Sequence, residues 1–98
     1  MKVVRQHNLS QEEATRKVGL LLKRVVRQHG ERIADPISVW TQDTLDFSFQ
    51  SNGMRFKGKV EVGELDVTLD LGIPLFAKPF EGGIRSSVER ELSFLFPQ

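Results

Sequence analysis

The sequence has no cysteine and no tyrosine among its 98 residues, and it has no long apolar run. Without cysteine, a disulfide framework, a cysteine-based zinc site, an iron–sulfur cluster and a thiol nucleophile are excluded, and the cytoplasm is the expected compartment. Residues 1–7 contain no apolar run of signal-peptide length, and no run elsewhere approaches the length of a membrane span. We therefore expect a cytoplasmic protein without a transmembrane segment.

Sequence motifs that carry catalysis are also missing. His7 and His29 are far apart in the chain, and no set of His, Asp or Glu has the spacing of metal ligands. There is no glycine-rich phosphate loop and no nucleophile elbow. We expect His7 to hydrogen-bond the backbone at the end of a strand, with a role as a base as the alternative, and His29 to end a helix as a partly buried cap. The sequence thus predicts no enzyme, no metal site and no cofactor.

The composition is that of one ordinary folded domain. Hydrophobic residues make up 39% and charged residues 28% of the chain, which is near the average for folded proteins and far from that of disordered ones. A chain of this length buries roughly 65% of its unfolded surface around one core. We therefore expect a single domain over residues 1–98.

The net charge of +1 conceals a strongly basic first third. Residues 1–32 hold eight basic and three acidic residues, whereas the rest of the chain holds six basic and ten acidic. The basic charge lies on a predicted helix over residues 11–29, which Ser10 and Glu13 open as a capping box and Gly30 ends. Helical spacing gives this helix an apolar core stripe made of Ala14, Val18, Leu21, Leu22, Val25 and His29. The opposite side is a basic face made of Arg16, Lys23, Arg24 and Arg27, with an exposed leucine, Leu20, among them.

Beyond this helix the hydrophobic period changes from 3.6 to 2, which predicts a four-stranded antiparallel meander. Asn52-Gly53 is a strong signal for a two-residue hairpin turn. It sets a register in which Phe49 faces Phe56 and the ring of Phe47 covers Gly58. A turn at Gly63-Glu64 would in the same way set the register of the last two strands.

That last register pairs Lys57 with Asp70 and Lys59 with Thr68, and it puts Leu65 at the start of an inward-facing apolar row. The orientation of Trp40 depends on a different turn. A three-residue connection over residues 41–43 turns Trp40 outward, whereas a two-residue turn brings it inward opposite Leu45. We prefer the outward orientation.

The ends of the chain complete the predicted fold. A strand over Val3–His7 precedes the first helix, and a compact apolar connection over residues 73–83 leads to a last helix with apolar positions at Ile84, Val88, Leu92 and Leu95. The order β-α-β-β-β-β-α predicts an α+β fold: a two-layer, helix-grip-like sandwich in which two helices cover one face of an antiparallel sheet. An N-terminal strand at the sheet edge would also allow a homodimer.

A series of ordered motifs runs along the chain. It comprises His7-Asn8-Leu9 before Glu12-Glu13-Ala14, then DTLDFS (43–48), GMRFKGKVEV (53–62), LGIPLF (71–76) and the stretch from Pro79-Phe80 to Ile84. Together these motifs, which are mostly turns and a strand glycine, resemble the small polyhydroxyalkanoic acid system family over almost the whole chain. The resemblance implies a bacterial protein associated with the synthesis, storage or granules of polyhydroxyalkanoate, a carbon-reserve polyester, and it carries over no catalytic residues. The tail Phe94-Leu95-Phe96 is more aromatic than the family's pattern.

The first functional hypothesis is a non-enzymatic accessory protein that adsorbs to the granule surface or to partner proteins of the polyhydroxyalkanoate system. The alternative for its basic helix is an ordinary solvated face. Nucleic acid is disfavoured as a partner because outward-facing acidic side chains interrupt any basic stripe. The predicted contact residues are Arg16, Leu20, Lys23, Arg24, Arg27, Phe94 and Phe96, of which the two phenylalanines would form an exposed apolar patch near the chain end.

The second functional hypothesis is a carrier of a small hydrophobic acyl ligand. The seven phenylalanines are most simply explained as core. A curved sheet that grips a C-terminal helix can also enclose a ligand, and Gly58, Gly82 and Gly83 would leave room for it. The residues predicted to line such a pocket are Phe47, Phe56, Phe76 and Phe80.

Overall fold

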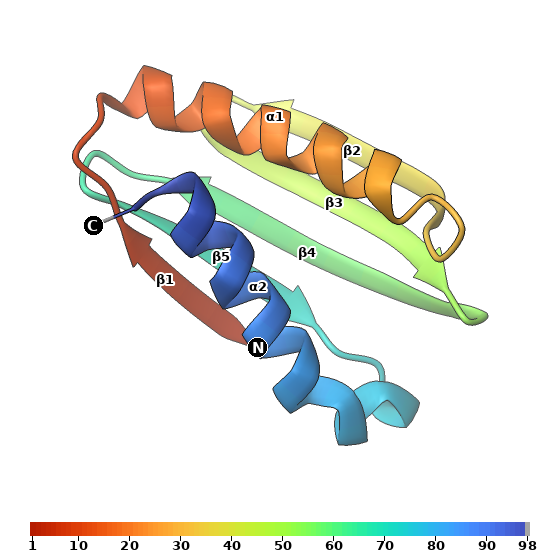
Figure 1. Cartoon of the computed structure of the whole chain (residues 1–98). Helices are drawn as coiled ribbons and strands as arrows, with labels where there is room; N and C mark the ends of the chain where they lie inside the picture. Colours follow the sequence, from red (N-terminus) through yellow and green to blue (C-terminus); the bar gives the residue numbers. More distant parts are fainter. Residues whose placement is uncertain (98) are drawn as a thin grey trace.

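The computed structural model describes residues 1–97 and has the predicted order of elements (Figure 1). The elements are β1 (Lys2–Gln6), α1 (Gln11–Gln28), β2 (Ala34–Thr41), β3 (Thr44–Ser51), β4 (Met54–Val62), β5 (Asp66–Gly72), the 3₁₀ helix η1 (Leu75–Phe80) and α2 (Glu81–Leu95). The α+β prediction is therefore confirmed. The connection after β5 is more regular than expected, because η1 fills it and α2 begins at Glu81 rather than near Ile84.

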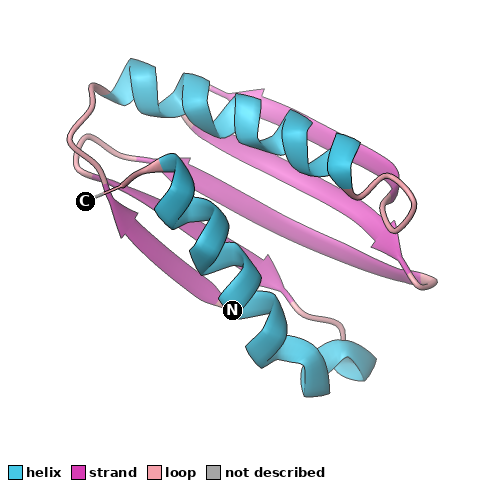
Figure 2. Ribbon diagram, viewed as in Figure 1, coloured by secondary structure: helices cyan, strands magenta, loops and turns pink. Residues whose placement is uncertain are grey.

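The strands form one five-stranded sheet in the order β1-β5-β4-β3-β2, with every neighbouring pair antiparallel. The N-terminal strand β1 pairs with the last strand, β5, and Val3 lies opposite Leu69. The two ends of the chain therefore lie at the same edge of the sheet. Both helices lie over one face of the sheet, α1 on the side of β2 and β3 and α2 on the side of β5 and β1 (Figure 2). This is the predicted two-layer arrangement.

Local chemistry accounts for the position of α1. The hydroxyl of Ser10 accepts a hydrogen bond from the backbone N–H of Glu13 at 3.1 Å, and this caps the first turn. Ala14 and Val18 are the buried residues of the helix and pack on the sheet. The N–H of His29 bonds the carbonyl oxygen of Val25 at 3.0 Å as the helix ends.

The β3–β4 hairpin has the predicted register. Phe49 pairs with Phe56 and Phe47 with Gly58, and Asn52-Gly53 forms the turn with both residues at positive φ, as the common two-residue hairpin requires. A Cβ atom added at Gly58 would lie 2.8 Å from Cε1 of Phe47. The ring of Phe47 therefore covers the glycine, as predicted.

The predicted β4–β5 register is wrong by two residues. Lys59 pairs with Asp70, and Lys57 pairs with Gly72. The reason is that the turn is centred on Glu64-Leu65, where the N–H of Gly63 donates to the carbonyl oxygen of Asp66 at 2.8 Å. A shift of two residues keeps every side chain on its predicted face, but Leu65 becomes a turn residue that is 75% exposed and does not belong to the apolar row.

The preferred orientation of Trp40 is also wrong. Thr41 pairs with Thr44 and Trp40 with Leu45, so the connection has two residues and Trp40 faces inward, toward α1 and Gly19. Tertiary contacts hold this turn in place, because Asp43 accepts a hydrogen bond from the hydroxyl of Thr15 through its carboxylate and one from the N–H of Val62 through its carbonyl, each at 2.9 Å.

The hydrophobic core is divided into two clusters. The larger one joins α1, the C-terminal part of the chain and the sheet, and it consists of Val3, Ala14, Val18, Leu45, Val60, Val62, Val67, Leu92 and Phe96. The smaller one lies under η1 and consists of Phe56, Leu71, Ile73 and Ala77. Of the residues that the structure describes, Met1 and Phe47 pack against both clusters, and both are half-buried. The part of the sheet between the two clusters is therefore incompletely covered.

Candidate functional site

A groove of about 1070 Å³ lies over this incompletely covered part of the sheet. It exists because α1 and α2 are close at the C-terminal end of α2 and diverge toward its N-terminal end (Figure 1). The groove is bounded by α1, α2, the end of η1 and the inner face of the sheet. We call this space the groove throughout.

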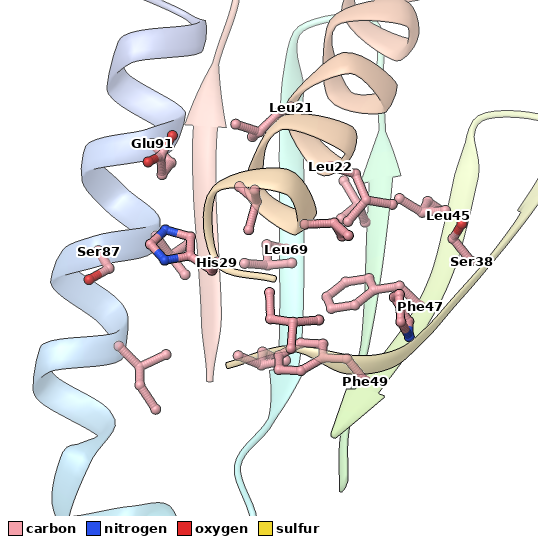
Figure 3. A pocket seen from close by; sticks show the side chains of 18 of the residues that line it. Leu21, Leu22, His29, Ser38, Leu45, Phe47, Phe49, Leu69, Ser87 and Glu91 are labelled. Atoms are coloured by element: carbon pink, nitrogen blue, oxygen red, sulfur yellow. The ribbon is translucent and has the colours of Figure 1, made fainter. Parts of the chain in front are cut away.

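Aromatic and aliphatic side chains form the floor of the groove. The rings of Phe47 and Phe49 are parallel with centroids 6.4 Å apart, and Phe49 stacks on Phe56 at 5.2 Å. Phe47, Phe49 and Leu69 on the sheet point into the same space as Leu21 and Leu22 on α1 (Figure 3). All five of these side chains are only half-buried. The protein thus leaves apolar surface uncovered where a closed core would be expected.

The walls of the groove come from both helices. α1 contributes the C-terminal part of its apolar stripe, namely Leu21, Leu22, Val25 and Val26. α2 contributes Ile84, Val88 and Leu92. Of these seven residues only Leu92 is buried. The apolar stripe of α1 is therefore buried core near the start of the helix and groove wall near its end. The stripe of α2 is groove wall near its start and core at Leu92.

Two contacts hold the helices together at the narrow end of the groove. Arg24 on α1 forms an ion pair with Glu91 on α2, and Lys17 donates to the carbonyl oxygen of Leu95 at 3.5 Å. About one turn of α1 follows Arg24 before the helix ends at Gln28. The ion pair therefore joins the two helices beside the groove, which Glu91 also lines.

The polar residues of the groove lie mostly on the last turns of α1 and on α2. Lys23, Arg27 and His29 from α1 and its C-terminal cap, and Ser87 and Arg90 from α2, are exposed residues that contribute to the lining. Glu91 also lines the groove, but its carboxylate is already paired with Arg24. Cationic groups therefore predominate at the rim.

The predicted basic face of α1 is only partly present. Leu20, Lys23 and Arg27 are exposed, as predicted. Arg16 is exposed but pairs with Glu13 at 3.2 Å, one turn away on the same helix. Arg24 does not belong to the exposed face: the ion pair with α2 draws it between the helices, where it is partly buried.

The predicted aromatic tail is wrong for one of its two residues. Phe94 is 71% exposed, with the Arg24 guanidinium 4.8 Å from its ring centroid. Phe96 is only 2% exposed and belongs to the larger core cluster. The chain end packs beside β1. The ring centroids of Phe96 and His7 are 5.6 Å apart, and the backbone carbonyl oxygen of Phe96 accepts a hydrogen bond from Nε of Arg5 at 3.0 Å.

The structure brings two of the four predicted pocket residues into the groove. Phe47 and Phe80 line it. Phe56 does not, because it is buried in the small cluster under η1, where the ring of Phe49 stacks on it. Phe76 does not, because η1 buries Ala77 instead and leaves Phe76 facing solvent.

The contribution of α1 to the groove was missed in the sequence. The signal that could have revealed it is the width of the apolar stripe, since Leu21-Leu22 and Val25-Val26 are consecutive apolar pairs. A helix that packs on a sheet through one narrow stripe needs only one apolar residue at each of these turns.

The two histidines have different surroundings. His7 is buried and bonds the backbone, as predicted: its Nδ1 accepts from the N–H of Leu9 at 3.2 Å, and its Nε2 lies 3.0 Å from the carbonyl oxygen of Gly63. With Nδ1 as acceptor, Nε2 carries the hydrogen and donates it. His29 caps α1 but is exposed at the groove rather than partly buried.

Residues 1–97 contain neither a metal-binding cluster nor a membrane-spanning helix. No group of three or more histidine, aspartate or glutamate side chains in this range could hold a metal ion. Within the same range, no helix combines the length and apolar character needed to cross a membrane.

Comparison with known proteins identifies a family. No curated protein and no solved structure matches the chain. The family described as "Putative polyhydroxyalkanoic acid system protein" matches residues 1–96. This match confirms the resemblance seen in the sequence motifs, which already covered almost the whole chain. The chain therefore belongs to this family of polyhydroxyalkanoic acid system proteins.

Proposed function

We propose that this protein is a non-catalytic carrier that binds the acyl chain of a hydroxyalkanoate in the groove, with the carboxylate head at the cationic rim. In this role the protein performs no chemical step and uses no cofactor. The binding site differs from the pocket expected between the sheet and the C-terminal helix, because it also includes α1.

The groove is the observation that carries the proposal. Its volume of about 1070 Å³ lies just above the usual range of roughly 300–1000 Å³ for small-molecule sites, and sites of that kind have mainly apolar walls with a few polar groups. A chain of 98 residues has little core to spare, and leaving Phe47, Leu69 and Val88 half-buried forfeits part of their burial energy. An apolar ligand in the groove would recover that energy.

Charge complementarity favours an anionic head group. Lys23, Arg27 and Arg90 lie at the rim, and the carboxylate among them, that of Glu91, is neutralised by Arg24. A carboxylate placed there gains charge-assisted hydrogen bonds without displacing an existing ion pair. An aliphatic chain with one carboxylate end thus fits both the floor and the rim.

Family membership supports the choice of ligand class. The family is named for polyhydroxyalkanoic acid, a polyester whose monomers and precursors carry aliphatic chains. Hydroxyalkanoates combine such a chain with an anionic head, which is the combination that the groove favours.

Surface adsorption through the basic face of α1 is the weaker candidate. Exposed Leu20 beside Lys23 and Arg27 favours it. Against it, Arg16 and Arg24 are already paired, and both remaining cations contribute to the groove. Co-sedimentation with polyhydroxyalkanoate particles that falls as salt rises, and that is lost in Lys23→Glu/Arg27→Glu, would favour this candidate over the groove.

A groove-filling substitution tests the carrier proposal. Val88→Trp places a large ring in the groove, whereas Val39→Trp adds the same ring to the exposed outer face of β2 and serves as the matched control. Isothermal titration with 3-hydroxydecanoate should show binding to the wild type and to Val39→Trp, and at least about tenfold weaker binding to Val88→Trp. Equal affinity for all three proteins would refute the proposed site.

A second substitution tests the orientation of the ligand. Arg27→Gln should weaken binding of the carboxylate several-fold and leave binding of the corresponding methyl ester unchanged, because only the charged head interacts with the guanidinium. Equal losses for acid and ester would contradict a carboxylate at the rim.

A further inference from the structure

The 3₁₀ helix η1 lies at one corner of the molecule, next to the start of α2 (Figure 1). Its large apolar side chains are exposed. Phe76 and Leu75 are 83% and 77% exposed, the two highest values among the large hydrophobic residues of the described chain, and Phe80 is 66% exposed. Exposed hydrophobic side chains are ordinary when scattered singly, but a cluster on one short segment is typical of a contact surface. We call these three residues the η1 patch.

The η1 patch is held rigidly. Ala77, in the middle of the segment, is 2% exposed and packs on the small core cluster with Ile73. Its N–H bonds the carbonyl oxygen of Pro74 at 2.9 Å, and Pro79 restricts the backbone further along. Ala77 takes the inward position, and the large side chains of Leu75 and Phe76 before it are left exposed.

Two features of the η1 patch indicate what covers it. The segment carries no unpaired charge, since Lys78 pairs with Glu81 at 3.4 Å, so the patch suits a neutral apolar surface better than an anionic one. It also adjoins the groove, because Pro79 and Phe80 line the groove. A surface that covers the patch would therefore meet the apolar interior of the groove.

We propose that the η1 patch inserts into the surface of a lipid layer and sets the open end of the groove against it. Aromatic and leucine side chains in this position can enter the boundary between head groups and acyl chains. An acyl ligand could then pass between the layer and the groove without crossing water. This last step rests on the proposed carrier function, whereas insertion itself does not.

Vesicle binding tests the insertion. Purified protein would be sedimented with phosphatidylcholine vesicles, which carry no net charge, at low and high salt. The variant is Leu75→Ser/Phe76→Ser, and the matched control is Leu65→Ser, an equally exposed leucine in the turn at the opposite end of β5. Neither variant touches the core, so both should keep the wild-type melting temperature.

We expect the wild type and Leu65→Ser to bind with little dependence on salt, because the contact is apolar. The double variant should partition roughly 100-fold more weakly, about tenfold for each buried side chain lost. Undiminished binding of the double variant would overturn the proposal. Binding that requires anionic lipid and falls with salt would overturn it in favour of the cations on α1, and binding to polyester particles but not to vesicles would overturn the choice of lipid.

Ligand binding in solution separates this proposal from the carrier function. The double variant leaves the groove intact, so its affinity for 3-hydroxydecanoate should equal that of the wild type, while its rate of ligand uptake from loaded vesicles should fall. A wild type that binds vesicles but no acyl ligand would refute the carrier function and leave the insertion standing.

Discussion

Replacing Gly58 with alanine should push the ring of Phe47 into the groove. A Cβ atom at Gly58 would lie 2.8 Å from Cε1 of that ring, closer than real Cβ atoms approach their neighbours, and 3.0 Å from Cε2. Gly58 is paired with Phe47 on one side and with Leu71 on the other, so the backbone is fixed from both sides. The ring must move, and the groove is the space beside it.

The expected cost of Gly58→Ala follows from this geometry. Overpacking a closed core costs about 1–3 kcal/mol, and because the ring can swing into open space we expect the lower limit, about 1 kcal/mol. For a domain of this size that corresponds to a fall of about 4–8 °C in melting temperature. Acyl affinity should fall as well, because the displaced ring occupies volume that the ligand needs.

Urea denaturation and isothermal titration of Gly58→Ala measure the two effects. Gly82→Ala is the control, since a Cβ atom there meets nothing within 4 Å and alanine in a helix should stabilise the protein by up to about 1 kcal/mol relative to glycine. If Gly58→Ala changes neither stability nor affinity, the Phe47 ring does not form the floor of the groove and the reasoning fails.

Two further substitutions test the corrected positions of predicted contact residues. Phe96→Ala should destabilise the protein by about 3–5 kcal/mol, because the ring is core, whereas Phe94→Ala should cost less than about 1 kcal/mol; equal losses in urea denaturation would contradict the assignment. Arg24→Met should cost about 1 kcal/mol, as expected for a partly exposed ion pair, and it should increase hydrogen exchange at the C-terminal end of α1 by releasing that helix from α2. Unchanged exchange there would show that the ion pair does not fix the groove.

Local signals predicted the elements and one register. Asn52-Gly53 allows essentially one hairpin geometry, and the pairing of Phe47 with Gly58 follows from it. Between β4 and β5, the same residues allow a turn centred on Gly63-Glu64, which was predicted, or one centred on Glu64-Leu65, which is observed. The hydrogen bond from the N–H of Gly63 to the carbonyl oxygen of Asp66 belongs to the observed turn. The inward orientation of Trp40 likewise depends on contacts that Asp43 makes with α1 and β4, far away in the sequence.

The groove was harder to predict than the fold. Apolar spacing on α1 and α2 shows which faces turn inward, but it does not show how far apart the helices lie. The helices are joined by the ion pair of Arg24 with Glu91, two residues that are distant in the sequence and whose pairing no local pattern encodes. The same spacing therefore predicted core for Val25 and Val88, where the structure has groove walls.

The most direct test of the carrier function is the dependence of affinity on chain length. Hydroxyalkanoates that differ only in the number of methylene groups would be titrated into the wild-type protein by calorimetry. Burial of each added methylene in the groove predicts a gain of about 0.8 kcal/mol, or roughly fourfold in affinity, until the groove is filled. Affinity that does not change with chain length, or no measurable binding at any length, would contradict the account.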